Sequence, residues 1–357
     1  MDLENKSDYI KGRGAQINIH NPFQKNEYTS EHIEGIDEQL QINPNTQFFY
    51  EEPRKIINDV TSPDLGFMYS MNPYQGCEHG CIYCYARNTH QYWGFSAGND
   101  FESKIIVKKN VPELLKKQLK NTKWEPSPIM LSGNTDCYQP IERKLGITRK
   151  VLETLLKYRH PVSIITKNSL LLRDMDILCE LNKYDLVHVS ITITSLDEEL
   201  RLKLEPRTST YKNRLDLVKK LSDKDIPVNV MMAPIIPSIN SHEIPQVLKA
   251  ISENGASTAA YTIVRLNGAI LEIFKDWLLK NFPDRSEKVL NQIADCHGGK
   301  LNDSSFGKRF KGEGQVAESI AKLFMVSKNK YFKGRRMKSF NLSHFHNRRK
   351  GQLGLFN

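Results

Sequence analysis

Short apolar runs alternate with segments of helical periodicity through the middle of the chain. The clearest strand signal is Leu186–Thr194, where β-branched residues dominate. The other expected strands are Pro128–Ser132, Val162–Thr166, Pro227–Ile236 and Ala259–Arg265. The expected helices are Thr148–Tyr158, Leu170–Leu181, Leu215–Leu221 and Ile244–Ser252. This alternation predicts an α/β fold of parallel βαβ units, arranged as a partial (β/α)6-type TIM barrel.

The two ends of the chain lack this pattern. A first strand is expected within Gly66–Gln75, and residues 1–60 contain no long periodic segment. We therefore predict an irregular N-terminal extension over 1–60, a barrel core over 61–275, and a helical and basic C-terminal region over 276–357. In a barrel of this kind, functional side chains gather at the carboxyl ends of the strands.

Composition places the chain among soluble globular proteins. It has 357 residues, 39% of them hydrophobic and 26% charged. No apolar stretch approaches the roughly 18 residues of a membrane span, and the first residues lack a signal-peptide pattern. Six cysteines in a chain of this length do not form a disulfide framework. These features predict a cytoplasmic protein with no membrane association.

The net charge of +10 comes from one end of the chain. The tail, defined as residues 319–357, contains ten lysines and arginines and no acidic residue, whereas the rest has 41 of each sign. Aromatic residues lie among these charges, including Tyr331, Phe332, Phe340 and Phe345. Such a tail is able to neutralise phosphates while its rings stack on the bases of DNA or RNA. The alternative is a solvated arm that packs on the body through its aromatic residues.

A cluster of three cysteines is the strongest chemical signal. Cys77, Cys81 and Cys84 have the spacing C-x₃-C-x₂-C within the segment 72–87, which we call the cysteine loop. Thiolates are the ligands that iron–sulfur clusters use, and a closed electron-carrying cluster normally has four. Three ligands indicate a [4Fe–4S] cluster with one iron open to a substrate or cofactor.

The cysteine loop, with Tyr83 and Tyr85 on either side of Cys84, resembles the radical S-adenosylmethionine (SAM) superfamily. The similarity is greatest to the branch related to spore photoproduct lyase, also called DNA-repair photolyase-like, and extends over about residues 60–275. The resemblance implies a [4Fe–4S] cluster and SAM as cofactors and an external electron donor of the flavodoxin or ferredoxin type. In this family the open iron binds SAM, and reduction releases a 5′-deoxyadenosyl radical that abstracts hydrogen from the substrate.

The resemblance also assigns roles to residues of this chain. Tyr83 matches a residue that covers the cofactor, and Tyr85 matches a hydrogen-atom relay. Thr135 and Asp136, in the loop after the second strand, match groups that hold the methionine ammonium. The alternatives are a packing role for Tyr83 and a turn or N-cap role for Asp136.

Further matches lie at the ends of later strands. Lys167 matches a lysine that pairs with the methionine carboxylate, and Arg207 is a candidate for the same carboxylate or for a substrate phosphate. Ser190 and Thr192 point to one face of their strand, where Ser190 is a candidate for the ribose hydroxyls. The alternatives are a solvent-facing lysine and an ordinary salt bridge of Arg207 with Glu205 or another acid.

One departure affects the substrate. The spore enzyme has a hydrogen-donating cysteine two residues before the matched hydroxyl, and this chain has Gly133 there. Cys137 lies nearby and is a candidate donor. The alternative is that Cys137 is a small buried residue, which is the commoner role of a free cysteine.

Two classes of function remain. The first is a radical enzyme, acting on nucleic acid as a repair lyase or in base modification, or acting on a small molecule or protein. The second is a non-catalytic iron–sulfur protein that binds or senses.

Overall fold

Six parallel strands and one antiparallel strand form the main sheet of the computed structural model, which describes residues 9–23 and 45–346. The parallel strands follow the order β3-β6-β7-β8-β9-β10, and β2 pairs antiparallel with β3 at the edge. Their bounds are Ile57–Asp59 (β2), Tyr69–Met71 (β3), Ile129–Leu131 (β6), Val162–Thr166 (β7), Val187–Thr192 (β8), Val228–Ile235 (β9) and Thr258–Ile263 (β10). The predicted α/β partial barrel is confirmed.

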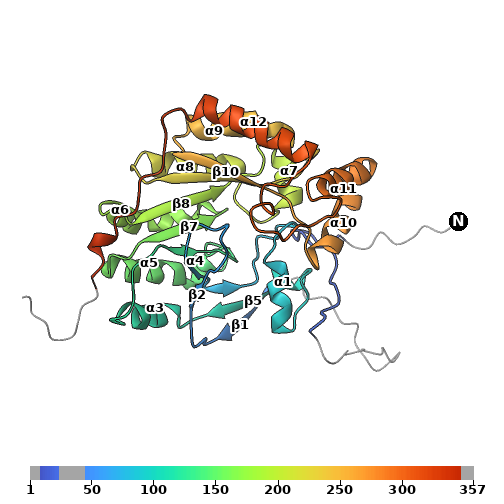
Figure 1. Ribbon diagram of the computed structural model, residues 1–357. Helices are drawn as coiled ribbons and strands as arrows, with labels where there is room; N and C mark the ends of the chain where they lie inside the picture. Colours follow the sequence, from blue (N-terminus) through green and yellow to red (C-terminus); the bar gives the residue numbers. More distant parts are fainter. Residues whose placement is uncertain (1–8, 24–44, 347–357) are drawn as a thin grey trace, which may run out of the picture.

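Helices cover the outer face of this sheet (Figure 1). Those that follow the barrel strands are α4 (Glu142–Leu145), α5 (Ile147–Lys157), α6 (Met175–Asn182), α7 (Glu198–Leu204), α8 (Tyr211–Ser222), α9 (Ile244–Glu253) and α10 (Ile270–Asn281). Helices α11 (Ser286–Asp295) and α12 (Gln315–Tyr331) come from the C-terminal region, and α12 lies on α9. The remaining helices, α1 (Arg87–His90), α2 (Asp100–Ser103) and α3 (Val111–Leu119), lie between β3 and β6.

Burial alternates along the strands and separates the two faces of the sheet. In β7 and β9 every second side chain is fully buried beneath helices, as at Ile164 and Val230, and the residues between them are partly exposed. The partly exposed positions, such as Ile165 and Asn229, therefore line the inner face of the barrel. Lys167 lies two residues after Ile165, so the same alternation directs it to the inner face of the barrel.

The main differences from the predicted elements lie outside the strongest strand runs. The expected helix Leu170–Leu181 is a 3-10 segment, Ser169–Asp174, followed by α6. Helices α7 and α10 were not predicted, and α10 runs across residue 275, where a boundary was expected. The division at residues 60 and 275 stays a prediction.

A second, three-stranded sheet lies beside the barrel. It contains β1 (Gln47–Glu51), β5 (Lys104–Lys108) and β4 (Tyr74–Gln75), in the order β1-β5-β4. Because β4 belongs to the start of the cysteine loop, this sheet fixes one end of that loop.

An N-terminal strap, residues 9–23, crosses the cysteine loop. Arg13, Gly14 and Ala15 are buried, and the amides of Gly14 and Ala15 donate to the Glu102 carboxylate at 2.9 and 2.8 Å. The same carboxylate accepts from Arg87 at 2.5 Å, and Arg87 Nε donates to the carbonyl oxygen of Cys81 at 3.0 Å. Glu102 therefore ties the strap to the cysteine loop.

The strap fits this place only with glycine at residue 14. A Cβ there would lie 1.8 Å from the carbonyl oxygen of Gly80 in the cysteine loop. A methyl group would therefore force the strap off the loop.

We predict that Gly14→Ala lowers the free energy of unfolding by about 2 kcal/mol or more, because the added carbon overpacks a buried backbone contact. Unfolding by denaturant measures the decrease in the free energy of unfolding, and limited proteolysis reports detachment of the strap. Gly66→Ala is the matched control, since a Cβ at Gly66 meets nothing within 4 Å. Equal stability of the two variants would contradict the packing argument.

Candidate functional site

The three cysteines of the C-x₃-C-x₂-C motif lie in the loop that leaves the carboxyl end of β3. Cys77 and Cys81 are buried and Cys84 is half-buried, and all three are free thiols. Burial raises the pKa of Cys77 well above its ordinary value and raises that of Cys81 to about 12. Both are protonated in the ligand-free chain, so binding iron would displace their protons.

The three thiols fit a cluster better than a single ion. In residues 9–23 and 45–346, no three acidic, histidine or cysteine side chains converge closely enough to hold one metal ion. In a four-iron cluster each cysteine binds a different iron, which spaces the thiolates more widely. Cys77 and Cys84 pack in one small cluster with Ala86 and Phe101, and Cys81 and Cys84 share another, so the thiols face a common region.

Asp136 joins the cysteine loop to the end of β7. Its carboxylate accepts from Thr166 Oγ1 at 2.8 Å, from the backbone amide of Lys167 at 2.8 Å and from that of Tyr138 at 2.9 Å. His79 Nδ1, in the cysteine loop, lies 3.3 Å away. Burial alone would raise the pKa of Asp136, but His79 and the backbone amides lower it to about 2.

This geometry agrees with the turn interpretation of Asp136, because the bond to Tyr138 spans two residues. Thr135 is also engaged within the protein: its hydroxyl donates to the carbonyl oxygen of Tyr74 at 2.5 Å. Contact of either side chain with a cofactor stays a prediction.

Cys137 lies in the same hydrophobic core as Tyr74, at the start of the cysteine loop. Its side chain has no exposed surface, belongs to the main hydrophobic core, and has a pKa raised by burial. This is the position of a small buried residue, and the donor role of Cys137 stays an untested prediction.

Tyr83 belongs to a buried polar network. Its hydroxyl donates to Glu205, which also accepts from Arg214 at 2.6 Å and from Thr194 at 3.0 Å. Burial alone would raise the pKa of Glu205, but Arg214 and Lys167 lower it to about 2. Arg207 lies 3.9 Å from Glu78, an acid other than Glu205, which agrees with the alternative of an ordinary salt bridge.

Lys167 carries an ammonium group into the middle of these residues. Its Nζ lies 5.9 Å from the centre of the Tyr83 ring, and no carboxylate of the described residues pairs with it within 4 Å. Burial opposes its charge, but nearby Cys81, Glu205 and Cys84 raise its pKa. The group is therefore charged and available to an anion.

Asn229 is a further candidate site residue, for which the sequence indicated no role. Its Nδ2 donates to Ser190 Oγ at 3.2 Å across the pairing of β8 with β9, and its buried Oδ1 has no partner within the described residues. Ser190 and Asn229 thus supply a hydroxyl and an unsatisfied acceptor on the inner face of the barrel. A polar residue within the apolar run Val228–Ile235 was the available signal.

The carboxyl ends of the strands form one open end of the barrel, which we call the mouth. Tyr85 reaches across this mouth to Gly133. Its side chain is 53% exposed, and its hydroxyl donates to the carbonyl oxygen of Gly133. A Cβ at Gly133 would lie 2.8 Å from Ser70 Oγ, so a cysteine there would require Ser70 to move. The structure thus brings the expected relay residue beside the position where the spore enzyme has its donor.

The tail packs against the opposite, amino-terminal ends of the strands. Phe340 stacks on His188 at 3.7 Å, and Phe345 meets His160 edge-on at 5.4 Å. Phe332 is buried, and Tyr331 packs against the main core. The aromatic residues therefore pack on the protein, which agrees with the alternative of an arm held by its aromatic residues, and binding of nucleic acid by the tail stays a prediction. Arg348, Arg349 and Lys350 lie outside the described residues.

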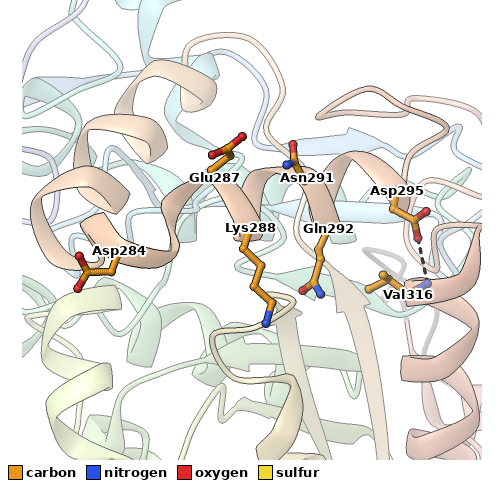
Figure 2. Close-up of a pocket in the computed structure, with 7 residues that line it drawn as sticks. All are labelled: Asp284, Glu287, Lys288, Asn291, Gln292, Asp295 and Val316. Carbon is orange, nitrogen blue, oxygen red and sulfur yellow. Dashed lines mark hydrogen bonds between the residues drawn. The ribbon is translucent and has the colours of Figure 1, made fainter.

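Two other features lie away from the cysteine loop. Figure 2 shows an open hollow beside α11 that is lined by Asp284, Glu287 and Lys288, with Asp295 accepting from the Val316 amide at 3.0 Å. It contains none of the predicted site residues. Separately, the described helices include none that is long and apolar enough to cross a membrane.

Comparison with curated proteins gives relatives without a known role. An uncharacterized protein of Mycobacterium tuberculosis is 32% identical over 222 residues, which is 62% of this chain and 65% of the relative. An uncharacterized protein of Methanocaldococcus jannaschii is 31% identical over 253 residues, or 71% of this chain and 90% of the relative. The chain therefore matches slightly less than two thirds of the mycobacterial protein.

Comparison with solved structures gives the same fold. Spore photoproduct lyase complexed with dinucleoside spore photoproduct has a TM-score of 0.62 at 15% identity, covering 85% of this chain and 86% of that one. A mutant of the lyase with bound AdoMet has a TM-score of 0.60 at 16% identity, covering 82% of each chain. The model of the radical SAM superfamily matches residues 71–251, which is half of the chain and includes the three cysteines, Lys167 and Asn229. This chain belongs to the radical SAM superfamily.

Proposed function

We propose that this protein is a radical SAM enzyme that acts on a nucleic acid, as a repair lyase or in base modification. The observation that carries the proposal is the meeting of the three-cysteine loop with the unpaired ammonium of Lys167 at the carboxyl ends of the strands. A purely structural cluster would have no need of a charged group held there against the cost of burial.

Cys77, Cys81 and Cys84 would hold a [4Fe–4S] cluster and leave its fourth iron for SAM. When reduced, such a cluster supplies the electron that cleaves SAM to a 5′-deoxyadenosyl radical. The chain's own part is to position SAM and exclude water. Buried Cys77 and Cys81 and the covering strap serve the second purpose.

Lys167 would bind the methionine carboxylate through a charge-assisted hydrogen bond. Ser190 and Asn229 would accept or donate to the ribose hydroxyls, which would satisfy the orphaned Asn229 oxygen. Tyr83 would cover the cofactor beside Lys167. Asp136 and Thr135 would act mainly through the backbone, since Asp136 fixes the amide of Lys167.

A nucleic-acid substrate is supported by the fold shared with an enzyme solved with a dinucleoside photoproduct. The exposed lysines and arginines of the tail, such as Lys333 and Arg336, remain available to phosphates, although they lie far from the mouth. Since Gly133 offers no thiol, we expect a reaction other than thymine-dimer repair unless another group donates hydrogen. A flavodoxin or ferredoxin would supply the electron.

We predict that anaerobically reconstituted protein, given dithionite and SAM, forms 5′-deoxyadenosine, because one iron of its cluster is open to SAM. Liquid chromatography with mass spectrometry measures the product. The Cys77→Ala, Cys81→Ala, Cys84→Ala triple variant is the control and should form none. If the wild-type protein contains iron and sulfide but forms no more 5′-deoxyadenosine than this control, the result would favour the non-catalytic iron–sulfur alternative.

We also predict that Lys167→Met weakens SAM binding about tenfold or more, since a hydrogen bond to a charged group is lost. Equilibrium dialysis of labelled SAM against reconstituted protein gives the Kd without requiring turnover. Lys183→Met is the matched control, because Lys183 is exposed and pairs with Glu180. An unchanged Kd for Lys167→Met, at equal iron content, would remove Lys167 from the cofactor site.

A further inference from the structure

A row of alternating cations and aromatic rings stands beside the mouth of the barrel. The guanidinium of Arg265 lies 5.2 Å from the centre of the Phe310 ring, and that of Arg309 lies 4.7 Å from the same ring. Arg309 is also 4.8 Å from the ring of Phe306. The row therefore runs Arg265, Phe310, Arg309, Phe306, and Phe306 at its end is 61% exposed.

The row is held by the bridging loop, residues 298–314, which connects the two edges of the barrel sheet. On the β10 side, the amide of Ile263 donates to the carbonyl oxygen of Phe310 at 2.8 Å. On the β2 side, Arg309 Nε donates to Asp64 at 2.6 Å, and the amide of Gly307 donates to the same carboxylate at 2.8 Å. Attachment at both edges keeps the rings in place without help from a ligand.

The two arginines differ in their charge compensation. Arg309 forms an ion pair with Asp64, whereas Arg265 pairs with no carboxylate of the described residues. The described hydrogen bond of Arg265 goes to the carbonyl oxygen of Asp303 at 3.3 Å, although a guanidinium has five N–H donors. Arg265 is half-buried, and its pKa is lowered by burial and by the charge of Arg309.

Arg265 also lies on the side of the reacting groups. It follows β10 at the carboxyl ends of the strands, where Tyr85 meets Gly133 after β6. An anion bound to Arg265 would thus be held at the same end of the barrel as the expected hydrogen-atom relay.

We propose that Arg265 is a substrate-phosphate subsite, which binds a phosphate of a single-stranded or unpaired nucleotide while Phe306 supports a neighbouring base. This inference rests on the function proposed above and specifies where the nucleic acid is held. Arginine matches the planar, bidentate geometry of phosphate oxygens, and an exposed ring beside a cation is a base-stacking surface. The subsite lies at the mouth, at the opposite end of the strands from the tail.

The test measures the affinity of the reconstituted full chain with SAM for a fluorescein-labelled single-stranded DNA 15-mer, as a function of salt. Arg265→Gln should weaken binding about tenfold at 100 mM salt. It should also reduce the slope of log K against log salt by about 0.7, the value for one phosphate contact on a single strand. Arg265→Lys should keep the slope but recover only part of the affinity. Lys220→Gln, at an exposed position of α8 where Lys220 pairs with Asp216, should change neither quantity.

A second arm removes the charge from the DNA and compares the wild-type chain with the Arg265→Gln chain. A neutral methylphosphonate replaces one phosphate linkage of the DNA at a time. At one of these linkages it should weaken binding to the wild-type chain as much as Arg265→Gln does. At that linkage it should cause no further loss of affinity in the Arg265→Gln chain. The subsite alone would be overturned if Arg265→Gln left DNA binding unchanged, or if Lys220→Gln weakened it as much. A wild-type chain that forms 5′-deoxyadenosine but binds no DNA would instead overturn the proposed nucleic-acid substrate, and the subsite with it.

Discussion

The carboxylate of Glu102 is the constraint on which the cysteine loop depends. It is fully buried, and a buried carboxylate is tolerated only when donors surround it. Here the donors are the amides of Gly14 and Ala15 and the guanidinium of Arg87. Arg87 in turn holds the backbone of Cys81. One charge therefore fixes together an N-terminal segment, the loop that carries the thiols, and the helix that follows it.

The same electrostatic logic divides the residues around the mouth into two groups. The acids are satisfied within the protein: Asp136 by backbone amides and His79, Glu205 by Arg214 and Tyr83, and Asp64 by Arg309. Lys167 and Arg265 are left without carboxylate partners among the described residues. A mouth with neutralised acids and available cations suits ligands that carry a carboxylate or a phosphate.

The barrel could be predicted from sequence because each strand is a local signal. Leu186–Thr194 and Val162–Thr166 are β-branched runs bounded by turns, and they coincide closely with β8 and β7. Helix α10 also carried a signal, since Ile270, Phe274 and Trp277 recur at helical spacing, but a boundary placed at 275 cut across it.

The surroundings of the site residues had no such local signal. The partners of Asp136 come from the cysteine loop and the end of β7, which only the folded chain brings together. The aromatic residues of the tail posed a different difficulty, because the same spacing serves for stacking on bases and for packing on the barrel. Their histidine partners, His160 and His188, are more than a hundred residues away.

The contact between Gly14 and Gly80 has a consequence for how this protein can diverge. The two positions lie far apart in sequence, yet the backbone carbonyl of Gly80 excludes a side chain at Gly14. Gly80 is also held at φ +70°, with Glu102 Oε2 only 2.8 Å from where a Cβ would be. Because a backbone oxygen blocks Gly14, no substitution at residue 80 makes room for a side chain at residue 14. Both glycines also lie against the Glu102 carboxylate, so a side chain at either would displace the group that ties the strap to the cysteine loop.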